Sequence, residues 1–304
     1  MAEQQAVERV AVFGGTGFLG RAIVARLVAA GTAARVVARH TEGPDGVQAD
    51  IRDEAAVARA LDGCNAAVNA VGLYVESGAE TYQSVHEQGA RTLAQQAAAL
   101  GLARLVLISG IGADETSESS YVRARAKGEA LVREAFPQAT ILRPSVIFGP
   151  EDKFLNTFAQ ILERAPFVPL FGRGETLLQP VYVGDMAEAA LGALSDPAAP
   201  GATYELGGPQ TYSYRALLEL VMSASGRKRP LLSVPFIFWD LAAAAAGLLP
   251  RPPLTRAQVV LMKQDNFVAE DARTLADLGL TASAIETVLP DYPFFRPSPN
   301  SQGR

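Results

Sequence analysis

The chain has 304 residues and is 49% hydrophobic, which is enough for about two globular domains with buried cores. Its formal net charge of −5 argues against a nucleic-acid partner, because such proteins carry a basic surface. A single cysteine, Cys64, excludes an internal disulfide and fits a reducing compartment, and two histidines without clustered cysteines predict no metal site.

Short apolar runs alternate with helical patterns over the first half of the chain. The predicted strands are 9–15, 34–39, 66–72, 103–110 and 138–149, and the predicted helices are 18–31, 53–62, 81–101 and 120–135. This alternation predicts an α/β fold with a parallel sheet covered by helices on both faces. We therefore expect a Rossmann-type, doubly wound nucleotide-binding fold.

The pattern changes after Pro150. Helical segments at 154–165, 185–194 and 214–225 dominate, with single strands near 180–183 and 203–207. We expect an NADP-binding Rossmann domain over residues 1–150 and a smaller, mainly helical C-terminal lobe over 151–292. The chain is expected to re-enter the core near 180–195, and residues 293–304 to form a flexible tail.

The apolar stretch "LLSVPFIFWDLAAAAAGLLP" (231–250) stands out in the second half. Pro235 and Asp240 interrupt it, so we predict no transmembrane helix. Two interpretations are open: a buried, Ala-rich core helix, or a helix that docks on a membrane protein or at the lipid interface.

The motif "GGTGFLG" lies between the first predicted strand and the first helix. Its glycines let the backbone turn sharply and approach a pyrophosphate, and the following helix presents free N–H groups. We therefore predict dinucleotide binding here. The residues expected to bind are Gly14, Thr16, Gly17, Phe18, Leu19, Gly20 and Arg21.

The end of the second strand is predicted to select the cofactor. An NAD site usually has an acidic residue there, whereas this chain has Arg39, which could bind a 2′-phosphate. We therefore predict NADP(H) rather than NAD. Asp50 is expected near the adenine amino group. The segment Asn69, Ala70, Val71 and Gly72 is expected to line the ribose and pyrophosphate.

These motifs, together with Tyr121 and "RPSVIFGP" (143–150), resemble the short-chain dehydrogenase/reductase superfamily in its extended or atypical branch. The resemblance implies that Pro144 and Val146 meet the nicotinamide. It also implies a catalytic tyrosine, with a lysine four residues later and a serine or threonine after the preceding strand.

Arg125 occupies the position of that lysine. A spacing of four residues puts it on the same helix face as Tyr121, but arginine does not exchange protons at ordinary pH. Ser109 lies one or two positions early, and Ile111 falls in the catalytic slot. We interpret Tyr121, Arg125 and Ser109 as a vestigial catalytic set that contacts the cofactor. This interpretation favours a chain without enzymatic activity, and a reductase with altered chemistry is the alternative.

The segments "VHEQGARTL", "GPEDKFLN" and "QPVYVGD" further resemble the nucleotide-binding accessory subunit of respiratory complex I and its bacterial relatives. This resemblance implies a structural NADPH and complex I subunits as partners. It also implies a cytoplasmic, peripheral location on the inner face of the inner membrane. The 231–250 stretch and "PPLTR" (252–256) are expected to supply the docking surface.

Two other functions are open. One is an NADP-dependent reductase or epimerase-like enzyme that acts on a quinone-like or other apolar substrate in a pocket of the second lobe. The other is a nucleotide-sensing module whose NADP(H) occupancy changes partner binding.

Overall fold

The computed structural model of the chain describes residues 7–249 and 254–295. Most of the predicted tail and the two prolines of "PPLTR" lie outside these residues. The chain forms two compact units. The first comprises residues 1–144, 184–206 and 268–281, and the second comprises 145–183, 207–267 and 282–304. The first unit thus receives the chain twice more after Pro144: over 184–206, which overlaps the re-entry expected near 180–195, and over 268–281, where no re-entry was expected.

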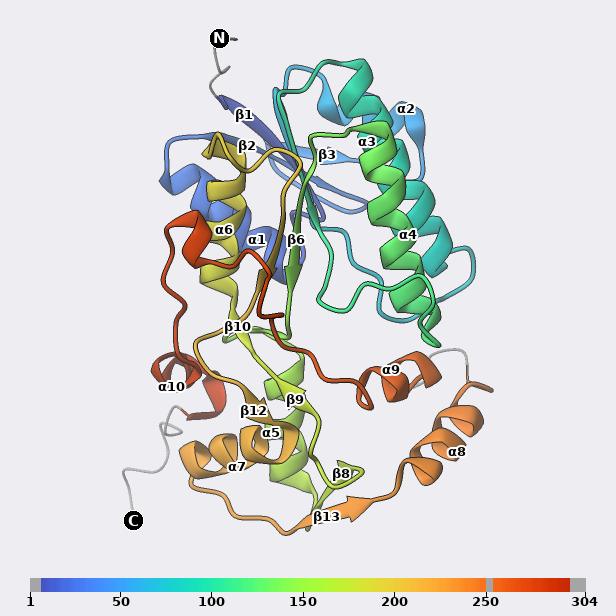
Figure 1. The fold of residues 1–304 in the computed structure, drawn as a ribbon, viewed down its shortest axis with the longest axis vertical. Coiled ribbons are helices and arrows are strands. Elements are labelled where there is room, and N and C mark those ends of the chain that lie inside the picture. Colours follow the sequence, from blue (N-terminus) through green and yellow to red (C-terminus); the bar gives the residue numbers. More distant parts are fainter. Residues whose placement is uncertain (1–6, 250–253, 296–304) are drawn as a thin grey trace. The chain divides into compact units, whose positions relative to one another are not determined.

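The first unit contains a seven-stranded sheet in the order β11-β6-β5-β4-β1-β2-β3 (Figure 1). All of its strand pairs are parallel. The strands are β1 (Arg9–Phe13), β2 (Ala33–Ala38), β3 (Gly46–Gln48), β4 (Ala66–Asn69), β5 (Arg104–Ile108), β6 (Thr140–Pro144) and β11 (Thr203–Leu206). The predicted doubly wound Rossmann fold is confirmed.

Helices cover both faces of this sheet. In Figure 1, α1 and α6 lie on one face, and α2, α3 and α4 lie on the other. The helices are α1 (Phe18–Ala29), α2 (Glu54–Leu61), the π-helix η1 (Gln83–Gly89), α3 (Ala90–Ala99), α4 (Ser120–Ala135) and α6 (Val183–Ser195); the 3₁₀ turn η2 (Ala276–Leu278) also belongs to this unit.

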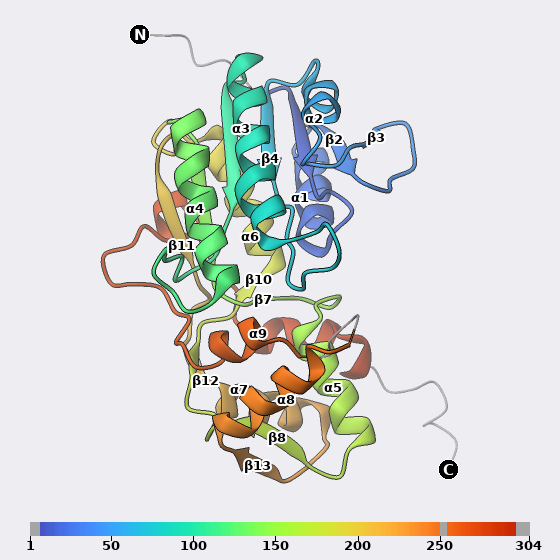
Figure 2. The ribbon, with the colours of Figure 1, turned by 90° about the vertical axis from the view of Figure 1, so that its right-hand side faces the viewer.

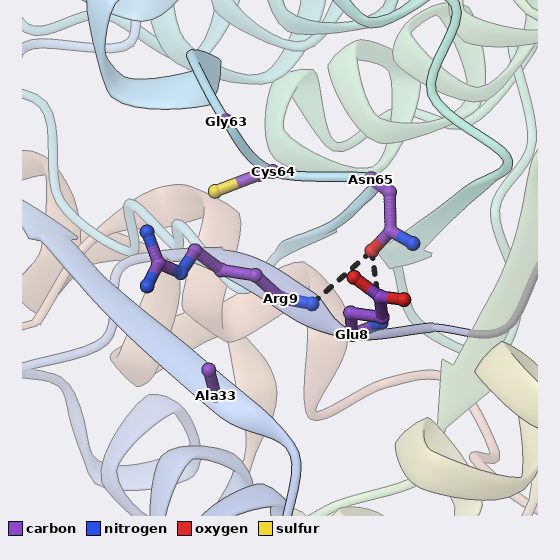
Figure 3. Close-up of a pocket in the computed structure, with 6 residues that line it drawn as sticks. All are labelled: Glu8, Arg9, Ala33, Gly63, Cys64 and Asn65. Carbon is purple, nitrogen blue, oxygen red and sulfur yellow. Dashed lines mark hydrogen bonds between the residues drawn. The ribbon is translucent and has the colours of Figure 1, made fainter.

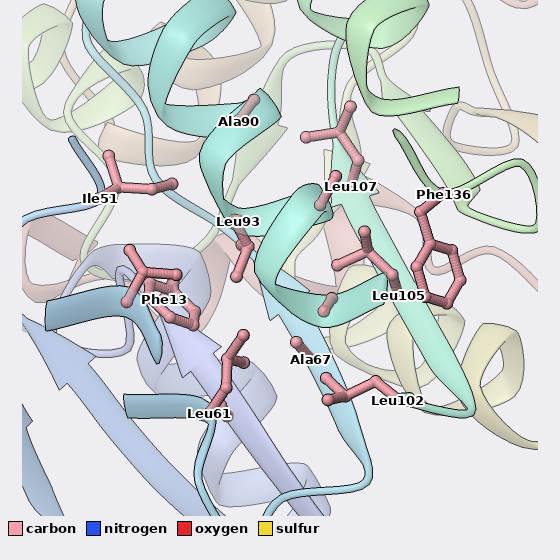
Figure 4. Close-up of a cluster of buried hydrophobic side chains, with 14 of the residues drawn as sticks. Phe13, Ile51, Leu61, Ala67, Ala90, Leu93, Leu102, Leu105, Leu107 and Phe136 are labelled. Atoms are coloured by element: carbon pink, nitrogen blue, oxygen red, sulfur yellow. The ribbon is translucent and has the colours of Figure 1, made fainter. Parts of the chain in front are cut away.

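A cluster of buried apolar side chains joins α2 and α3 to the sheet (Figure 4). Phe13, Leu61, Leu93 and Leu105 are each at most 2% exposed. Complete burial of one such side chain stabilises a fold by about 1.5–3 kcal/mol. This cluster therefore stabilises the packing of α2 and α3 against the sheet.

The second unit contains three two-stranded sheets packed with helices. Its strands are β7 (Ile147–Phe148), β8 (Val168–Phe171), β9 (Leu177–Leu178), β10 (Val181–Tyr182), β12 (Tyr212–Ser213) and β13 (Leu231–Val234). Its helices are α5 (Phe154–Arg164), α7 (Tyr214–Ser225), α8 (Phe236–Ala246), α9 (Arg256–Leu261), α10 (Ile285–Val288), η3 (Leu289–Asp291) and η4 (Pro293–Phe295). Figure 2 shows α8 beside α9.

The motif "GPEDKFLN" builds one joint of this unit. The Asp152 carboxylate accepts hydrogen bonds from the Gly149 N–H at 3.1 Å, the Leu155 N–H at 2.7 Å and the Tyr292 hydroxyl. Asp152 and Tyr292 are both buried. This residue therefore ties the start of α5 to the C-terminal turns.

Two predicted elements differ from the structure in their boundaries. The expected strand 138–149 divides into β6 and β7, because the chain passes from the first unit to the second after Pro144. The expected helix 81–101 begins with a π-helix before it continues as α3.

The interpretation of residues 231–250 as a buried helix is wrong. The first four residues form a strand, Pro235 starts α8, and Ala243 is the one buried side chain of that helix. Among the described residues, no helix is long and apolar enough to cross a membrane.

Candidate functional site

The glycine loop turns at the carboxyl end of β1. Gly14 has a positive φ of 78°, and a Cβ on it would lie 2.7 Å from the Ala70 carbonyl oxygen. A Cβ on Gly20 would overlap the Gly14 carbonyl oxygen. Only glycine permits this approach of loop, helix and neighbouring strand. The loop is therefore a cradle of bare backbone, as a bound pyrophosphate requires.

The start of α1 faces this cradle. Gly17 is its N-cap, and no side chain caps the helix there. Phe18 and Leu19 form the first turn, and the Arg21 guanidinium donates to the Thr16 carbonyl oxygen at 3.0 Å. The first N–H groups of the helix and its positive dipole end could therefore serve a phosphate.

The segment after β4 lies against the glycine loop. The buried Asn69 side chain accepts from the Val71 N–H at 3.1 Å, and the Ala70 N–H donates to the Phe13 carbonyl oxygen at 2.9 Å. Gly72 follows directly. The structure thus brings residues 69–72 and the loop 14–20 together at one edge of the sheet.

Arg39 and Asp50, which follow β2 and β3, each have a partner within the chain. Arg39 is exposed and forms an ion pair with Glu80. The Asp50 carboxylate pairs with Arg52, at 2.6 Å between Nη2 and Oδ2. The hydrogen bonds from Arg52 hold the pKa of Asp50 below its ordinary value. A ligand at either residue would compete with these partners.

Tyr121 lies in the first turn of α4 inside a box of aromatic rings. Its ring centroid is 5.7 Å from that of Tyr74, 5.4 Å from that of Tyr82 and 5.5 Å from that of His86. Burial raises the pKa of its hydroxyl well above the usual range, and the charge of Arg125 opposes this effect. The phenol therefore holds its proton tightly.

Arg125 is one turn further along α4. Its Cζ lies 5.0 Å from the centre of the Tyr121 ring, a cation–π contact. Its Nε atom is buried without a hydrogen-bond partner among the described residues. A Cβ on Gly110 would overlap its Nη1 atom, so this glycine makes room for the guanidinium. Arg125 therefore has hydrogen-bonding capacity to offer a ligand.

His86, on the π-helix, completes the aromatic box. Its Nε2 lies 3.3 Å from the Leu73 N and 3.1 Å from the Leu73 carbonyl oxygen. Burial and then the nearby charge of Arg125 lower the pKa of His86 to about 4. Near neutral pH it is therefore an uncharged packing residue.

The Ser109 hydroxyl is bonded to one partner of an ion pair between Glu129 and Arg143. It donates a hydrogen bond to the carboxylate of Glu129. Arg143 donates to the same carboxylate, from Nε at 3.0 Å to Oε1 and 3.2 Å to Oε2 and from Nη2 at 2.7 Å to Oε2. Arg143 also lies 3.6 Å from Glu205. The proton of Ser109 is therefore engaged within the protein.

The two residues expected at the nicotinamide belong to different units. Pro144 ends β6, and its carbonyl oxygen accepts from the Ile111 N–H at 3.0 Å. Val146 lies in the second unit.

Several residues around the site escaped the sequence analysis. Tyr74, Tyr82 and Glu80 come from the loop and helix after β4, where no motif marks them. Glu129 had a signal, because it lies four residues after Arg125 and shares the helix face of Tyr121 and Arg125. No group of three or more His, Cys, Asp or Glu side chains suited to a metal occurs among the described residues.

A hollow in the first unit lies at the amino ends of the strands, at the other end of the sheet from the glycine loop; Figure 3 shows its lining residues. Its lining includes Arg9, Cys64 and Asn65, and the Asn65 Oδ1 accepts from the Arg9 N–H at 3.2 Å. These residues stand at the amino ends of β1 and β4. Ligands of open parallel sheets bind at the carboxyl ends, so this hollow does not belong to the nucleotide site.

The strand order, the glycine cradle and the helix that starts from it define an NAD(P)-binding Rossmann protein of the short-chain dehydrogenase/reductase type. Residues 10–207 match the NAD dependent epimerase/dehydratase family, and the chain belongs to this family.

Solved structures share this fold. The crystal structure of gox2253 has a TM-score of 0.71 at 23% identity and covers 93% of this chain and 96% of its own. The UDP-glucose 4-epimerase of Thermus thermophilus, in complex with NAD, has a TM-score of 0.63 at 22% identity and covers 84% and 97%.

Curated relatives extend over most of the chain. The mitochondrial NADH dehydrogenase [ubiquinone] 1 alpha subcomplex subunit 9 of Arabidopsis thaliana is 32% identical over 293 residues, covering 88% of this chain and 73% of the relative. The same subunit of Mus musculus is 31% identical, covering 90% and 77%. A ceramide reductase of Caulobacter vibrioides is 33% identical over 186 residues, covering 59% and 58%.

Proposed function

We propose that the chain is a nucleotide-binding, non-catalytic accessory subunit of a bacterial respiratory complex I. Similarity over about nine tenths of the chain to subunits of NADH dehydrogenase [ubiquinone] carries this proposal. The bound nucleotide holds the first unit in its folded form, and the protein is peripheral on the inner face of the inner membrane.

The chemistry of the site supports a structural role. A reductase of this superfamily needs a tyrosine that gives up its proton, with a lysine beside it. Here Tyr121 is buried with a raised pKa, and its neighbour four residues on is Arg125. The Ser109 hydroxyl is bonded to Glu129. A positioned general acid contributes about 10²–10⁴ in rate, so hydride transfer would be slow.

We propose NADP(H) as the nucleotide. The glycine loop 14–20, with residues 69–72, binds the pyrophosphate and the adjacent ribose, and Arg125 binds the ribose on the nicotinamide side. Arg39 binds the 2′-phosphate, which displaces the carboxylate of Glu80 from its ion pair. The Arg39 guanidinium pairs with the carboxylate of Glu80. It is therefore accessible to another anion of similar geometry, such as a phosphate.

The second candidate function is an NADP-dependent reductase that acts on an apolar substrate. The similarity to a ceramide reductase over 186 residues favours it. Under this proposal NADPH would supply the hydride and Tyr121 would donate the proton to the substrate, while the positive charge of Arg125 lowers the pKa of the phenol.

A native pull-down separates the two. The tagged protein is purified from mildly solubilised membranes of its own host, and its companions are identified after native electrophoresis. Co-migration with subunits of NADH:ubiquinone oxidoreductase supports the accessory function, and a free protein opposes it. Arg125→Lys is the second arm: it leaves co-migration unchanged for an accessory subunit, whereas a gain in NADPH-dependent turnover identifies a reductase.

A further inference from the structure

The inner face of α8 holds this helix on the second unit. The indole Nε1 of Trp239 donates to the Leu170 carbonyl oxygen at 3.1 Å, and its ring centroid lies 4.3 Å from that of Phe171. Ala243 is buried on the same side. The position of α8 within the unit is therefore fixed by specific contacts.

The outer face of α8 is apolar and exposed. Ile237, Phe238 and Leu241 are 60%, 59% and 61% exposed, and they fall within an arc of about 100° on the helix. The turn that follows adds Leu248 and Leu249, at 88% and 54%. In Figure 1, α8 lies at the edge of the second unit. Clustered exposed apolar side chains mark an interaction surface.

A hollow lined by two arginines and one glutamate lies beside the strand that leads into α8. Its lining residues are Arg173, Gly174, Glu175, Ser213, Arg215 and Ser233. Arg215 donates to the Arg173 carbonyl oxygen at 3.3 Å and to the Ser233 hydroxyl at 3.4 Å. The Arg215 guanidinium also lies 3.8 Å from the Glu219 carboxylate, whereas within residues 7–249 and 254–295 the Arg173 guanidinium makes no hydrogen bond or ion pair. Two guanidinium groups and two hydroxyls match a phosphate group.

The hollow and the apolar face are close along the chain. Ser233 lines the hollow, and Ile237 begins the apolar face four residues later, so at most about 14 Å of chain separates them. Three further cations, Arg227, Lys228 and Arg229, precede Pro230 and β13, and Arg227 forms an ion pair with Glu163. A phosphate and the hydrocarbon attached to it could therefore be bound by neighbouring parts of one surface.

The charge of the two units distinguishes between possible occupants. The second unit has 12 Lys and Arg residues against 9 Asp and Glu residues, whereas the first has 15 against 23. A second copy paired through the same face would bring two basic units together, which costs free energy. An anionic lipid surface attracts the second unit through the same charges.

We propose that the outer face of α8 and the adjacent Arg173–Arg215 hollow form a binding site for anionic phospholipid. The arginines take the headgroup phosphate, and Ile237, Phe238 and Leu241 enter the boundary between headgroups and acyl chains. This site attaches the second unit to a membrane surface without a spanning helix.

Co-sedimentation of the full chain with vesicles tests the proposal. We expect strong binding to phosphatidylcholine vesicles that contain phosphatidylglycerol and at least tenfold weaker binding to phosphatidylcholine alone. Ile237→Asn with Leu241→Asn, and separately Arg173→Gln with Arg215→Gln, should each reduce binding at least tenfold. Glu175→Gln should strengthen binding to the vesicles that contain phosphatidylglycerol, because it removes a negative charge beside the two arginines.

Matched controls are Val28→Asn, an apolar side chain 60% exposed in the first unit, and Arg91→Gln, an exposed cation there. Either double variant binding like the wild type overturns the proposal. If free glycerol phosphate binds the wild type and the Ile237→Asn, Leu241→Asn variant equally well, the ligand of the hollow is a soluble phosphate instead. A dimer in sedimentation analysis that the α8 variant abolishes identifies a second copy. The vesicle assay contains no other protein, so its result is independent of the pull-down.

Discussion

His86 makes the stability of the first unit depend on pH. Burial lowers its pKa from 6.5 to about 4 in the folded protein. Between these values the unfolded chain binds a proton that the folded chain does not, so stability falls as pH falls. The difference, at about 1.4 kcal/mol per pH unit, amounts to about 3 kcal/mol, lost progressively below pH 6.5 and fully by the folded pKa.

The variant His86→Phe isolates this effect. It keeps an aromatic ring against Tyr121 but loses the hydrogen bond to Leu73, so we expect a cost of about 1 kcal/mol near neutral pH. Near pH 4.5 the wild type has lost most of the stability that depends on a neutral His86. The variant should then have a free energy of unfolding equal to or above that of the wild type. Urea unfolding at both pH values measures the two free energies, and His40→Phe is the control. A cost for His86→Phe that is the same at both pH values refutes a neutral, buried His86.

Three further predictions concern the glycine loop, the cofactor and the second unit. Gly20→Ala should destabilise the first unit by about 1–3 kcal/mol and weaken nucleotide binding, because its Cβ overlaps a backbone carbonyl; Gly192→Ala, with its nearest neighbour at 3.7 Å, should stabilise by about 0.5–1 kcal/mol in thermal unfolding. Arg39→Glu should weaken NADP binding at least about tenfold by calorimetric titration and leave NAD binding nearly unchanged, since a lost charge-assisted bond costs about 1.5–3 kcal/mol; equal losses for both would contradict it. Tyr292→Phe should cost about 1–3 kcal/mol because it removes a donor from the buried Asp152 carboxylate, and unchanged stability would show that water replaces the hydroxyl.

The part of the site that the sequence could predict is local in the chain. The loop 14–20 was identifiable because a strand, three spaced glycines and a helix follow each other without interruption. The Tyr121–Arg125 pair was identifiable because a spacing of four fixes a shared helix face. In such cases the local backbone geometry decides which groups meet.

Long-range contacts could not be predicted. The pairing of Arg39 with Glu80 joins residues from separate connections, and the rings of Tyr74 and Tyr82 reach Tyr121 through the path of the chain after β4. No spacing rule relates these positions. The meeting of the aromatic rings depends on the packing of α4 against the π-helix.

Composition alone also misled. The α8 segment is apolar on nearly every side, which is typical of a buried helix. The structure leaves most of it exposed, because β13 and the contacts of Trp239 place it at the edge of its unit. A run of apolar residues predicts that the segment will be removed from water. It does not distinguish burial in the protein's own core from burial against a partner or a membrane.

The anchoring contact of α8 also gives the protein a built-in optical probe. Trp239 is the one tryptophan in the chain, and its indole bonds the Leu170 carbonyl oxygen beside the ring of Phe171. Selectively excited tryptophan emission therefore originates from this joint alone. A shift in its wavelength or its quenching reports whether α8 stays seated on β8, while the nucleotide-binding unit contributes no tryptophan signal.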